Sequence, residues 1–170
     1  EGGFSVERVR QIAGEDYEKA LKNIFLLKPT NFNEQKKAFD ELLKRLKDEV
    51  SLIIVDGMTI LYRIDFATAR QEDMKSMQGI NSELVRQIKT LAEIARKREI
   101  PVIVTNQTYN WENESKMVGG DILKYWSKCH IEVVNDKGKR TAFLRKHRSL
   151  PEKSLEFQIT NSGIKKKGWI

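Results

Sequence analysis

A single carboxylate follows an aliphatic run near the middle of the chain. Residues 52–55 are Leu-Ile-Ile-Val, and Asp56 comes directly after them. Four aliphatic residues in a row are typical of a strand buried on both faces, as in a parallel sheet covered by helices. Open α/β sheets bind ligands at the carboxyl ends of their strands, and nucleotide hydrolases hold Mg²⁺ with an aspartate in this position. The pattern predicts a magnesium-linked nucleotide site at Asp56, and a plain strand end with a turn is the alternative.

The elements around Asp56 alternate between strand and helix. Residues 24–27 form an apolar run that predicts a strand, and Asn31 followed by Glu34 gives the next helix a start that resembles a capping box. A second long helix precedes residues 102–104, Val-Ile-Val, which are followed by Thr-Asn-Gln. This alternation is expected for right-handed crossovers in a parallel sheet. The apolar faces of the two helices consist of Phe39, Leu42, Leu43 and Leu46, and of Leu84, Ile88, Leu91 and Ala95.

Both ends of the chain add further elements. Ser5 can cap a first helix, and residues 15–23 predict a second short one. Towards the C-terminus the pattern becomes antiparallel, with residues 131–134 and 140–145 on either side of an Asp-Lys-Gly-Lys turn and residues 155–160 alternating between apolar and polar. The sequence therefore predicts one α/β domain over residues 1–170, with a mainly parallel sheet flanked by helices and antiparallel strands at its C-terminal end.

Two segments depart from this periodicity. Residues 65–79 are polar and mixed in charge, and residues 108–118 form a polar stretch that holds two aromatic residues. Both are expected to be irregular, and the first of them to be mobile. Gly119 and Gly120 then open a short helix.

The chain is strongly basic. It has 31 lysine and arginine residues against 24 aspartate and glutamate residues, a net charge of +7 and a pI of about 9.4. A domain pI above about 9 is a footprint of nucleic-acid binding, although many basic side chains are simply solvated on helix faces. Cys129 is the only cysteine, so no internal disulfide can form and a reducing compartment, the cytoplasm, is expected. No apolar stretch approaches the roughly 20 residues of a membrane span.

Three segments in a fixed order resemble a known family. Residues 1–9 are Glu-Gly-Gly-Phe-Ser-Val-Glu-Arg-Val, residues 52–56 are followed by Arg63, and residues 100–107 are Ile-Pro-Val-Ile-Val-Thr-Asn-Gln. Together they resemble the RecA-like recombinases of archaea, the RadA and RadB families, and are most similar to the short RadB type that lacks an N-terminal helical domain. The resemblance runs over essentially the whole chain and implies a RecA-like P-loop NTPase core.

The resemblance implies nucleotide chemistry for several residues. Glu1 matches the glutamate that orients or activates the attacking water, Arg8 an arginine near the adenine, and Asp56 the aspartate linked indirectly to Mg²⁺. Gln107 matches the residue that senses the γ-phosphate, a task that suits a neutral amide. Glu1 and Gln107 are the catalytic candidates, and ATP with Mg²⁺ is the expected cofactor. The alternatives are a frayed terminus for Glu1, a solvated helix surface for Arg8 and a strand-end cap for Gln107.

A basic turn before Pro151 completes the candidates on the nucleotide side. The resemblance implies that Lys146, His147 and Arg148 reach nucleotide phosphate, including across an interface between subunits of an oligomer. A basic surface turn without a ligand is the alternative.

The two irregular segments correspond to the DNA-binding loops of the family. In residues 65–79, Arg70 and Lys75 are candidate phosphate contacts. In residues 108–118, Tyr109 and Trp111 are candidates for stacking on bases, which contributes roughly 1–3 kcal/mol per base. The alternative is that these aromatic side chains pack the loop onto the domain.

The charge of the second loop limits this function. Lys116 is its only basic residue, whereas Glu112 and Glu114 oppose a polyanion. The composition favours an accessory DNA binder over a strand-exchange enzyme. The expected partners are single-stranded or branched DNA and other recombination proteins, with no membrane.

The phosphate-binding motif G-x-x-x-x-G-K-[ST] occurs nowhere in these residues. The family places it upstream of the segment that begins at Glu1, on a strand central to the sheet. We therefore expect an N-terminally incomplete domain with a large apolar face left open, and no tight ATP binding or hydrolysis by this chain alone. A first residue other than Met suggests a processed product, an excised segment or a partial sequence.

These observations favour a RadB-like protein of DNA repair and homologous recombination, which binds DNA and, when intact, ATP with weak ATPase activity. A non-enzymatic DNA-binding or mediator module with a RecA fold is one alternative. A RecA-like ATPase of another branch, such as a relative of the ring helicases, is the other. A phosphate-binding motif roughly 25 residues upstream of Glu1 would support the first of the three, and its absence from the gene the second.

Overall fold

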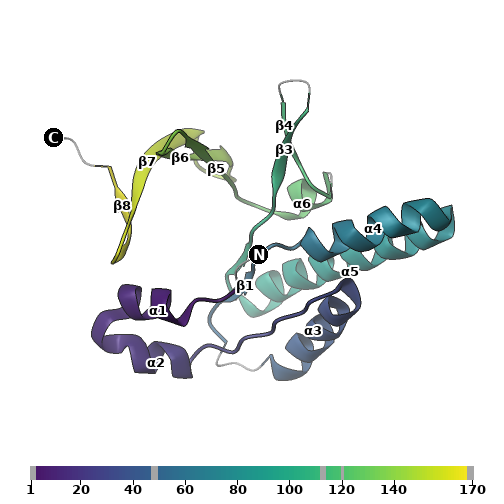
Figure 1. Cartoon of the computed structure of the whole chain (residues 1–170), viewed down its shortest axis with the longest axis horizontal. Helices are drawn as coiled ribbons and strands as arrows, with labels where there is room; N and C mark the ends of the chain where they lie inside the picture. Colours follow the sequence, from purple (N-terminus) through teal and green to yellow (C-terminus); the bar gives the residue numbers. More distant parts are fainter. Residues whose placement is uncertain (1–2, 47–49, 112–113, 120, 168–170) are drawn as a thin grey trace. The chain divides into compact units, whose positions relative to one another are not determined.

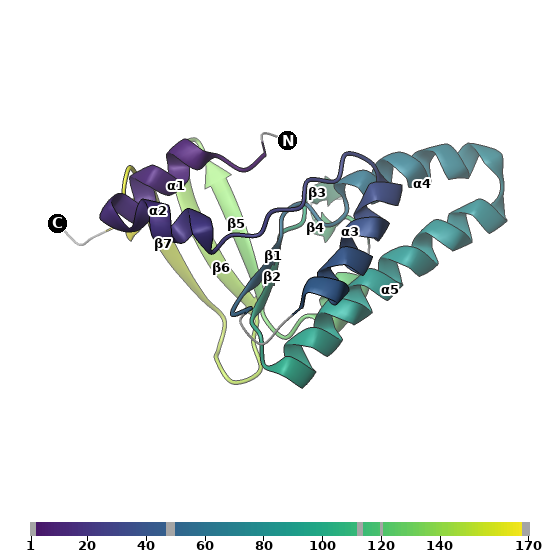
Figure 2. The ribbon, with the colours of Figure 1, turned by 90° about the horizontal axis from the view of Figure 1, so that it is seen from below.

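The computed structural model describes residues 3–46, 50–111, 114–119 and 121–167. The chain divides into two compact units, one of Glu1–Lys28 with Lys128–Ile170 and one of Pro29–Ser127. Figure 1 labels most helices and strands of both, and β2 is labelled in Figure 2. Helices with a parallel strand pair are followed by antiparallel strands, which confirms the predicted fold class.

A pair of parallel strands lies in the second unit. β1 (Ile53–Val55) pairs with β2 (Val102–Val104) in a register that joins Ile53 to Val102 and Val55 to Val104. Ile53 faces the core and is 7% exposed, whereas Ile54 and Ile103 point the other way and are 60% and 51% exposed. The two strands are therefore confirmed, but the prediction that they are buried on both faces holds for one face only, because alternate residues of a strand point to opposite sides.

Helices of the second unit cover the buried face of this pair and supply most of its core. They are α3 (Phe32–Arg45), α4 (Ile60–Glu72), α5 (Met74–Arg98) and α6 (Asp121–Trp126). Figures 1 and 2 show α4 and α5 side by side with opposite directions. The buried residues of α5 recur every three to four positions and pack with apolar residues of the other elements, as an amphipathic helix requires. The core consists of Phe32, Phe39, Leu46, Ile53, Met58, Tyr62, Leu84, Ile88, Leu91, Ile94, Ile100 and Leu123.

The start of α3 has the predicted cap. The Asn31 side chain accepts a hydrogen bond from the backbone N–H of Glu34 at 2.9 Å. The Glu34 carboxylate accepts bonds from the backbone N–H and the hydroxyl of Thr30, both at 2.8 Å, and these bonds hold the pKa of the carboxyl below its usual value. Asn31 and Glu34 therefore form a variant of the capping box, in which Glu34 accepts from Thr30, the residue before the N-cap, in place of the N-cap itself.

Residues 65–79 are helical, so the prediction of an irregular segment there is wrong. They belong to the end of α4 and the start of α5, which are separated at Asp73. The Asp73 side chain accepts from the N–H of Ser76 at 2.7 Å and so caps α5. Tyr62 and Ala69 are buried, and the ring of Phe66 stacks on that of Tyr62 at 5.4 Å. These three residues form an apolar face at helical spacing that begins before residue 65. The face is hard to recognise from residues 65–79 alone, because most of those residues are polar.

Residues 108–111 and 114–117 form strands where the sequence predicted an irregular loop. β3 (Thr108–Trp111) pairs antiparallel with β4 (Glu114–Met117), from Thr108 opposite Met117 to Trp111 opposite Glu114. β3 is the next element of the chain after β2, and Figure 1 shows β3 and β4 side by side. The helix expected after this hairpin is present as α6.

The first unit combines two short helices with four antiparallel strands. Ser5 caps α1 (Val6–Ala13) by accepting from the N–H of Arg8 at 3.2 Å, and a 3₁₀ turn connects α1 to α2 (Tyr17–Lys22). The predicted turn joins the first two strands at Lys137 and Gly138, both with positive φ, as two-residue hairpins require. The strands run in the order β5 (His130–Asp136), β6 (Lys139–Lys146), β7 (Lys153–Thr160) and β8 (Gly163–Lys166).

The predicted strand at residues 24–27 does not form. These residues lie outside every described strand, and the side chains of Ile24 and Phe25 are 41% and 57% exposed. A strand is stabilised by backbone hydrogen bonds to a neighbour, and no described strand pairs with this segment. The apolar composition of residues 24–27 was therefore not enough to predict a strand.

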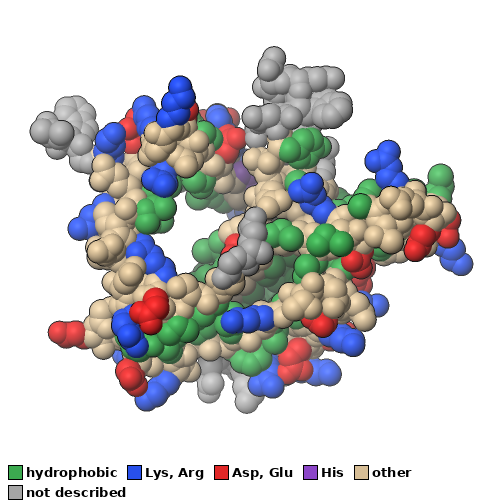
Figure 3. Space-filling model, in the orientation of Figure 1, with side chains coloured by type: hydrophobic (Ala, Val, Ile, Leu, Met, Phe, Trp, Pro, Cys, Tyr) green, Lys and Arg blue, Asp and Glu red, His purple; other side chains and the backbone are tan. Residues whose placement is uncertain are grey.

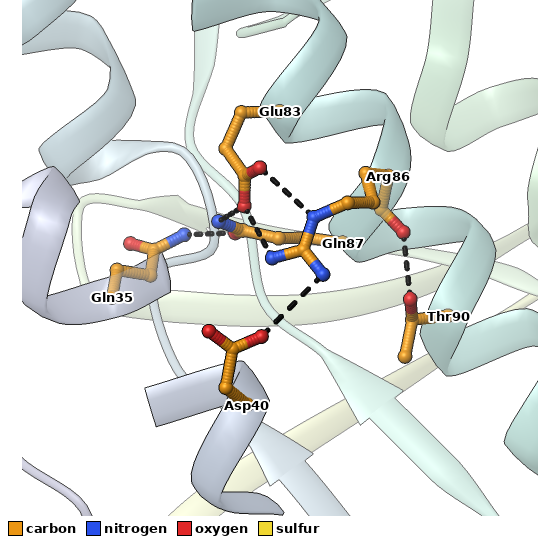
Figure 4. A network of polar contacts seen from close by, with 6 residues as sticks. All are labelled: Gln35, Asp40, Glu83, Arg86, Gln87 and Thr90. Carbon is orange, nitrogen blue, oxygen red and sulfur yellow. Dashed lines mark hydrogen bonds and ion pairs between the residues drawn. The ribbon is translucent and has the colours of Figure 1, made fainter. Parts of the chain in front are cut away.

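A buried polar network ties α3 to α5 (Figure 4). Gln35 and Gln87 are 5% and 0% exposed, and the Gln35 amide donates to the Gln87 oxygen at 2.8 Å and to the carbonyl of Met58 at 3.2 Å. The Gln87 amide donates to Glu83 at 2.8 Å, and Arg86 binds the same carboxylate with two N–H groups. Burial raises the pKa of the Glu83 carboxyl, but these hydrogen bonds outweigh it and the pKa lies below its usual value.

We expect the Gln87→Ala variant to be less stable than the parent chain by about 2–3 kcal/mol, because the buried Gln35 amide and the Glu83 carboxylate each lose one hydrogen bond and a cavity opens. Urea denaturation followed by circular dichroism measures the difference. Gln78→Ala, at an exposed position of the same helix, is the matched control and should change stability by less than about 0.5 kcal/mol. Equal effects of the two substitutions would contradict the role given to the network.

Candidate functional site

The carboxyl ends of β1 and β2 meet at Asp56 and Thr105. The Thr105 hydroxyl donates a hydrogen bond to Oδ1 of Asp56 at 2.5 Å and accepts one from the N–H of Gly57 at 2.8 Å. Asp56 itself is exposed. A carboxylate held in this way at the end of a parallel strand is in the position where such sheets bind ligands.

Asn106 connects the start of α4 to the base of the hairpin. The hydroxyl of Thr59, which is fully buried, donates to Oδ1 of Asn106, and the Asn106 amide donates to the carbonyl of Val118 at 2.7 Å. Gly119 has a φ of +82°, and a Cβ there would lie 3.1 Å from a methyl carbon of Thr59. The close approach of the hairpin base to Thr59 therefore favours glycine at residue 119.

Gln107 is bound by α4. Its side-chain oxygen accepts a hydrogen bond from the guanidinium of Arg63 at 3.1 Å, and its carbonyl accepts from the N–H of Val118 at 3.1 Å. Thr105 therefore contacts the end of β1, whereas Asn106 and Gln107 each contact both the hairpin base and the N-terminal part of α4. The structure brings the predicted Asp56 and Gln107 to the same edge of the parallel pair.

An open pocket of about 300 Å³ lies between α4 and the hairpin. Its wall combines the guanidinium of Arg63 with aromatic and apolar side chains, and Tyr109 on it is 47% exposed. Burial raises the pKa of Tyr62, whose hydroxyl donates to Asn81 at 2.6 Å. The pocket can accept a flat apolar group beside an anion. The lining residues are Tyr62, Arg63, Phe66, Tyr109, Met117, Val118 and Gly119.

The side chains around Asp56 fit a magnesium ion that is held mainly by phosphate and water. Within the described ranges, no group of three or more histidine, cysteine, aspartate or glutamate side chains could hold a metal ion. Mg²⁺ does not need such a group, since it usually keeps several waters and binds through one or two carboxylates together with substrate phosphates. Exposed Asp56, with Oδ1 fixed by Thr105, meets that requirement.

Comparisons with known proteins decide the family. A sequence model described as Rad51 matches residues 1–167. A DNA repair and recombination protein RadB from Methanobrevibacter smithii is 41% identical over 96% of this chain and 71% of its own length. RadB proteins from Methanocaldococcus jannaschii and Methanococcoides burtonii are 35% and 38% identical over 96% of this chain and over 76% and 72% of their own lengths. The chain belongs to the RadB group of the Rad51 family.

Among the residues expected for nucleotide chemistry in a Rad51-family protein, Glu1 lies outside the described residues. Arg8 is in the first unit, where its guanidinium donates to the carbonyls of Thr160 and Asn161 at 2.7 and 3.1 Å and to Gln11 at 2.9 Å. These bonds join α1 to the turn after β7. An interaction of Arg8 with adenine stays a prediction.

The basic turn after β6 is ordered by a histidine. Nδ1 of His147 accepts hydrogen bonds from the N–H groups of Ser149 and Leu150 at 3.1 and 3.0 Å. Lys146 and Arg148 on either side of it are exposed. All of these residues belong to the first unit, and their contact with nucleotide phosphate stays a prediction.

The DNA-binding candidates lie on helices and on the hairpin. Arg70 is in the last turn of α4 and Lys75 in the first turn of α5, and both are exposed. Trp111 and Lys116 have strand backbone in β3 and β4, and their side chains lie outside the described set. Figure 3 shows basic and acidic side chains interspersed over the helices of the second unit, so the face in view has no single basic block there.

The sequence analysis gave no role to Thr59 or Thr105, and placed Arg63 only within a motif. Thr105 and Asn106 directly follow the apolar run at residues 102–104 and precede the candidate Gln107, which was the available signal. Thr59 has no such signal, because its partner is distant in the sequence.

We expect Thr59→Val to lower the stability of the chain by about 1–3 kcal/mol, because the half-buried Asn106 loses its hydroxyl partner while the side-chain shape is kept. Urea denaturation measures the loss, and amide hydrogen exchange at Val118 should become faster. Thr68→Val removes a hydroxyl that bonds to Ile64 at 3.3 Å on the exposed surface of α4 and is the control. A Thr59→Val chain as stable as the control would show that the connection to the hairpin is not needed.

Proposed function

We propose that this chain acts as a RadB-type DNA repair and recombination protein that binds DNA and, when intact, Mg²⁺ with ATP. The names of the relatives support the process, and one observation supports the chemistry: residues 105–107 bind the Asp56 end of β1, the hairpin base and Arg63. The family model spans both compact units, which supports a single RecA-like domain. No described helix is long and apolar enough to cross a membrane. The cytoplasm is the proposed location.

On the nucleotide side, Asp56 would hold the hydrated magnesium ion and Gln107 would contact the terminal phosphate. Mg²⁺, when bound, neutralises charge that develops on the phosphate oxygens. The Gln107 amide has two N–H groups that can donate to phosphate or to a water, and its oxygen is occupied by Arg63. That bond orients the amide so that its donors point away from Arg63. Glu1, Arg8, Lys146 and Arg148 complete the proposed nucleotide contacts.

On the DNA side, the hairpin and the pocket beside it would bind single-stranded or branched DNA. Tyr109 and Phe66 offer aromatic surface to a base, and Arg63 offers a cation to its phosphate. Arg70, Lys75, Trp111 and Lys116 are the further proposed contacts. The two glutamates among residues 108–118 of the sequence support an accessory role over strand exchange. Other recombination proteins are the proposed protein partners.

A non-enzymatic mediator is the second candidate function. In this function the family fold would serve for interaction alone, and the two glutamates among residues 108–118, which favour an accessory role, support it. The relatives are RadB proteins, which favours this group over another branch of RecA-like ATPases.

In the full gene product, we expect Asp56→Asn to lose magnesium-dependent affinity for a fluorescent ATP analogue by about tenfold or more, since the carboxylate charge is removed while the shape is kept. Titration of Mg²⁺ at a fixed concentration of the ATP analogue measures this change in affinity. Asp136→Asn, in a turn that accepts asparagine, is the charge-matched control and should behave as the parent. A parent protein whose nucleotide binding is absent, or is independent of Mg²⁺, would favour the mediator.

Affinity for single-stranded DNA should fall about fivefold or more in Tyr109→Ala and in Trp111→Ala, because each loses stacking on a base. Fluorescence anisotropy with a labelled oligothymidine measures this, and parent binding should weaken steeply as salt increases. Tyr125→Ala, at a residue that is 77% exposed on α6, is the control for loss of an exposed tyrosine. Unchanged affinity in both hairpin variants would remove the hairpin from the DNA site.

A further inference from the structure

Thr105 contacts the carboxylate and the turn that follows it with one hydroxyl group. A hydroxyl has a single proton to donate and two lone pairs to accept with. Here the proton goes to Oδ1 of Asp56, and one lone pair accepts the N–H of Gly57. Among the described residues, Thr105 is the only donor to the Asp56 carboxylate. The exposed carboxylate is therefore oriented by one side chain from the neighbouring strand.

The backbone around Thr105 fixes where this hydroxyl lies. The N–H of Thr105 donates to the carbonyl of Val55 at 3.0 Å, and the carbonyl of Thr105 accepts from the N–H of Met58 at 3.1 Å. Both bonds extend the β1–β2 pairing past the last strand residues. The Thr105 side chain is thus placed by the sheet before any ligand binds, which is what an orienting group requires.

The turn at Gly57 is shaped to complete this contact. Gly57 has a φ of +76°, and a Cβ at that position would lie 2.4 Å from Cδ1 of Ile60. This left-handed conformation directs the Gly57 N–H to the Thr105 oxygen and is adopted easily only by glycine. The acceptor contact in turn leaves the Thr105 proton for the carboxylate.

We propose that Thr105 is a positioning residue for the nucleotide-bound magnesium ion. It fixes Oδ1 of Asp56 and leaves Oδ2 for the hydrated ion, so the carboxylate does not have to be ordered when Mg²⁺ and nucleotide bind. This inference rests on the proposed function. Residues that orient a metal ligand through a hydrogen bond commonly change metal affinity by about 10- to 100-fold when they are replaced.

A purely structural role for Thr105 makes a different prediction. If the hydroxyl only joined two strand ends, its loss would lower the melting temperature with or without Mg²⁺ and leave the magnesium dependence of nucleotide binding unchanged. The magnesium concentration at half-maximal nucleotide binding therefore separates the two roles.

The test compares Thr105→Val, Thr105→Ser and Thr90→Val in the full gene product, with the fluorescent ATP analogue at fixed concentration and Mg²⁺ varied. We expect the valine variant to need about tenfold more Mg²⁺ or more for half-maximal binding, and the serine variant, which keeps the hydroxyl, to stay near the parent. Thr90→Val removes a hydroxyl bond of 2.9 Å within α5 and should leave the midpoint unchanged. Hydrogen exchange at the Gly57 amide, measured without nucleotide, should be faster in Thr105→Val only.

Each outcome decides the proposal. A valine variant with the parent's magnesium midpoint, or a serine variant shifted as far as the valine variant, overturns the positioning role and leaves the proposed function intact. A parent protein without magnesium-dependent nucleotide binding overturns both. If melting shows that Thr105→Val does not fold, Thr105→Ala, which introduces no methyl group in place of the hydroxyl, is compared with Thr105→Ser under the same criteria.

Discussion

Backbone hydrogen bonds just beyond the β1–β2 pair fix the residues on which the proposed site depends. The backbone N–H of Thr105 donates to the carbonyl of Val55, and the carbonyl of Thr105 accepts from the N–H of Met58. The two segments that follow the strands therefore stay in register past the last strand residues and into the turn at Gly57. Because the backbone is held there, the next three side chains have fixed starting points. Thr105 then reaches the carboxylate, Asn106 the hairpin base and Gln107 the guanidinium of Arg63.

The residues proposed for nucleotide binding and those proposed for DNA binding are therefore connected through the same hydrogen bonds. The Asp56 turn continues into Thr59 at the start of α4, and Thr59 bonds to Asn106, which bonds to the hairpin at Val118. Arg63, one turn along α4, both lines the pocket and holds Gln107. Such contiguous polar contacts are the physical means by which a ligand at one site can bias another, given a second arrangement of the same contacts.

The sequence predicted the parts of the fold that local patterns determine. The strand ending at Asp56 and the cap at Asn31 follow from residue types within a few positions, and so does the turn at Gly138; each is present. The apolar run at residues 24–27 had the composition of a strand but finds no neighbour among the described strands. A strand depends on a partner that its own residues do not encode.

The remaining errors have similar causes. The helical pattern of residues 65–79 becomes visible only when Tyr62 is read together with them, because Tyr62 is the first residue of the buried face of α4. For the site, the sequence singled out Asp56 and Gln107, and the structure puts them at one edge. It could not single out Thr105 as the partner of Asp56, because that contact joins residues 49 positions apart. The bond of Arg8 to the carbonyl of Thr160 joins residues that are still farther apart, at 152 positions.

A crystal structure of the full gene product with Mg²⁺ and a non-hydrolysable ATP analogue tests the central claim most directly. The account predicts that the Thr105 hydroxyl remains on Oδ1 of Asp56 while the other carboxylate oxygen faces the hydrated ion, and that the Gln107 amide points to the terminal phosphate. An ion held elsewhere, with Asp56 turned away and still bonded only to Thr105, would contradict it.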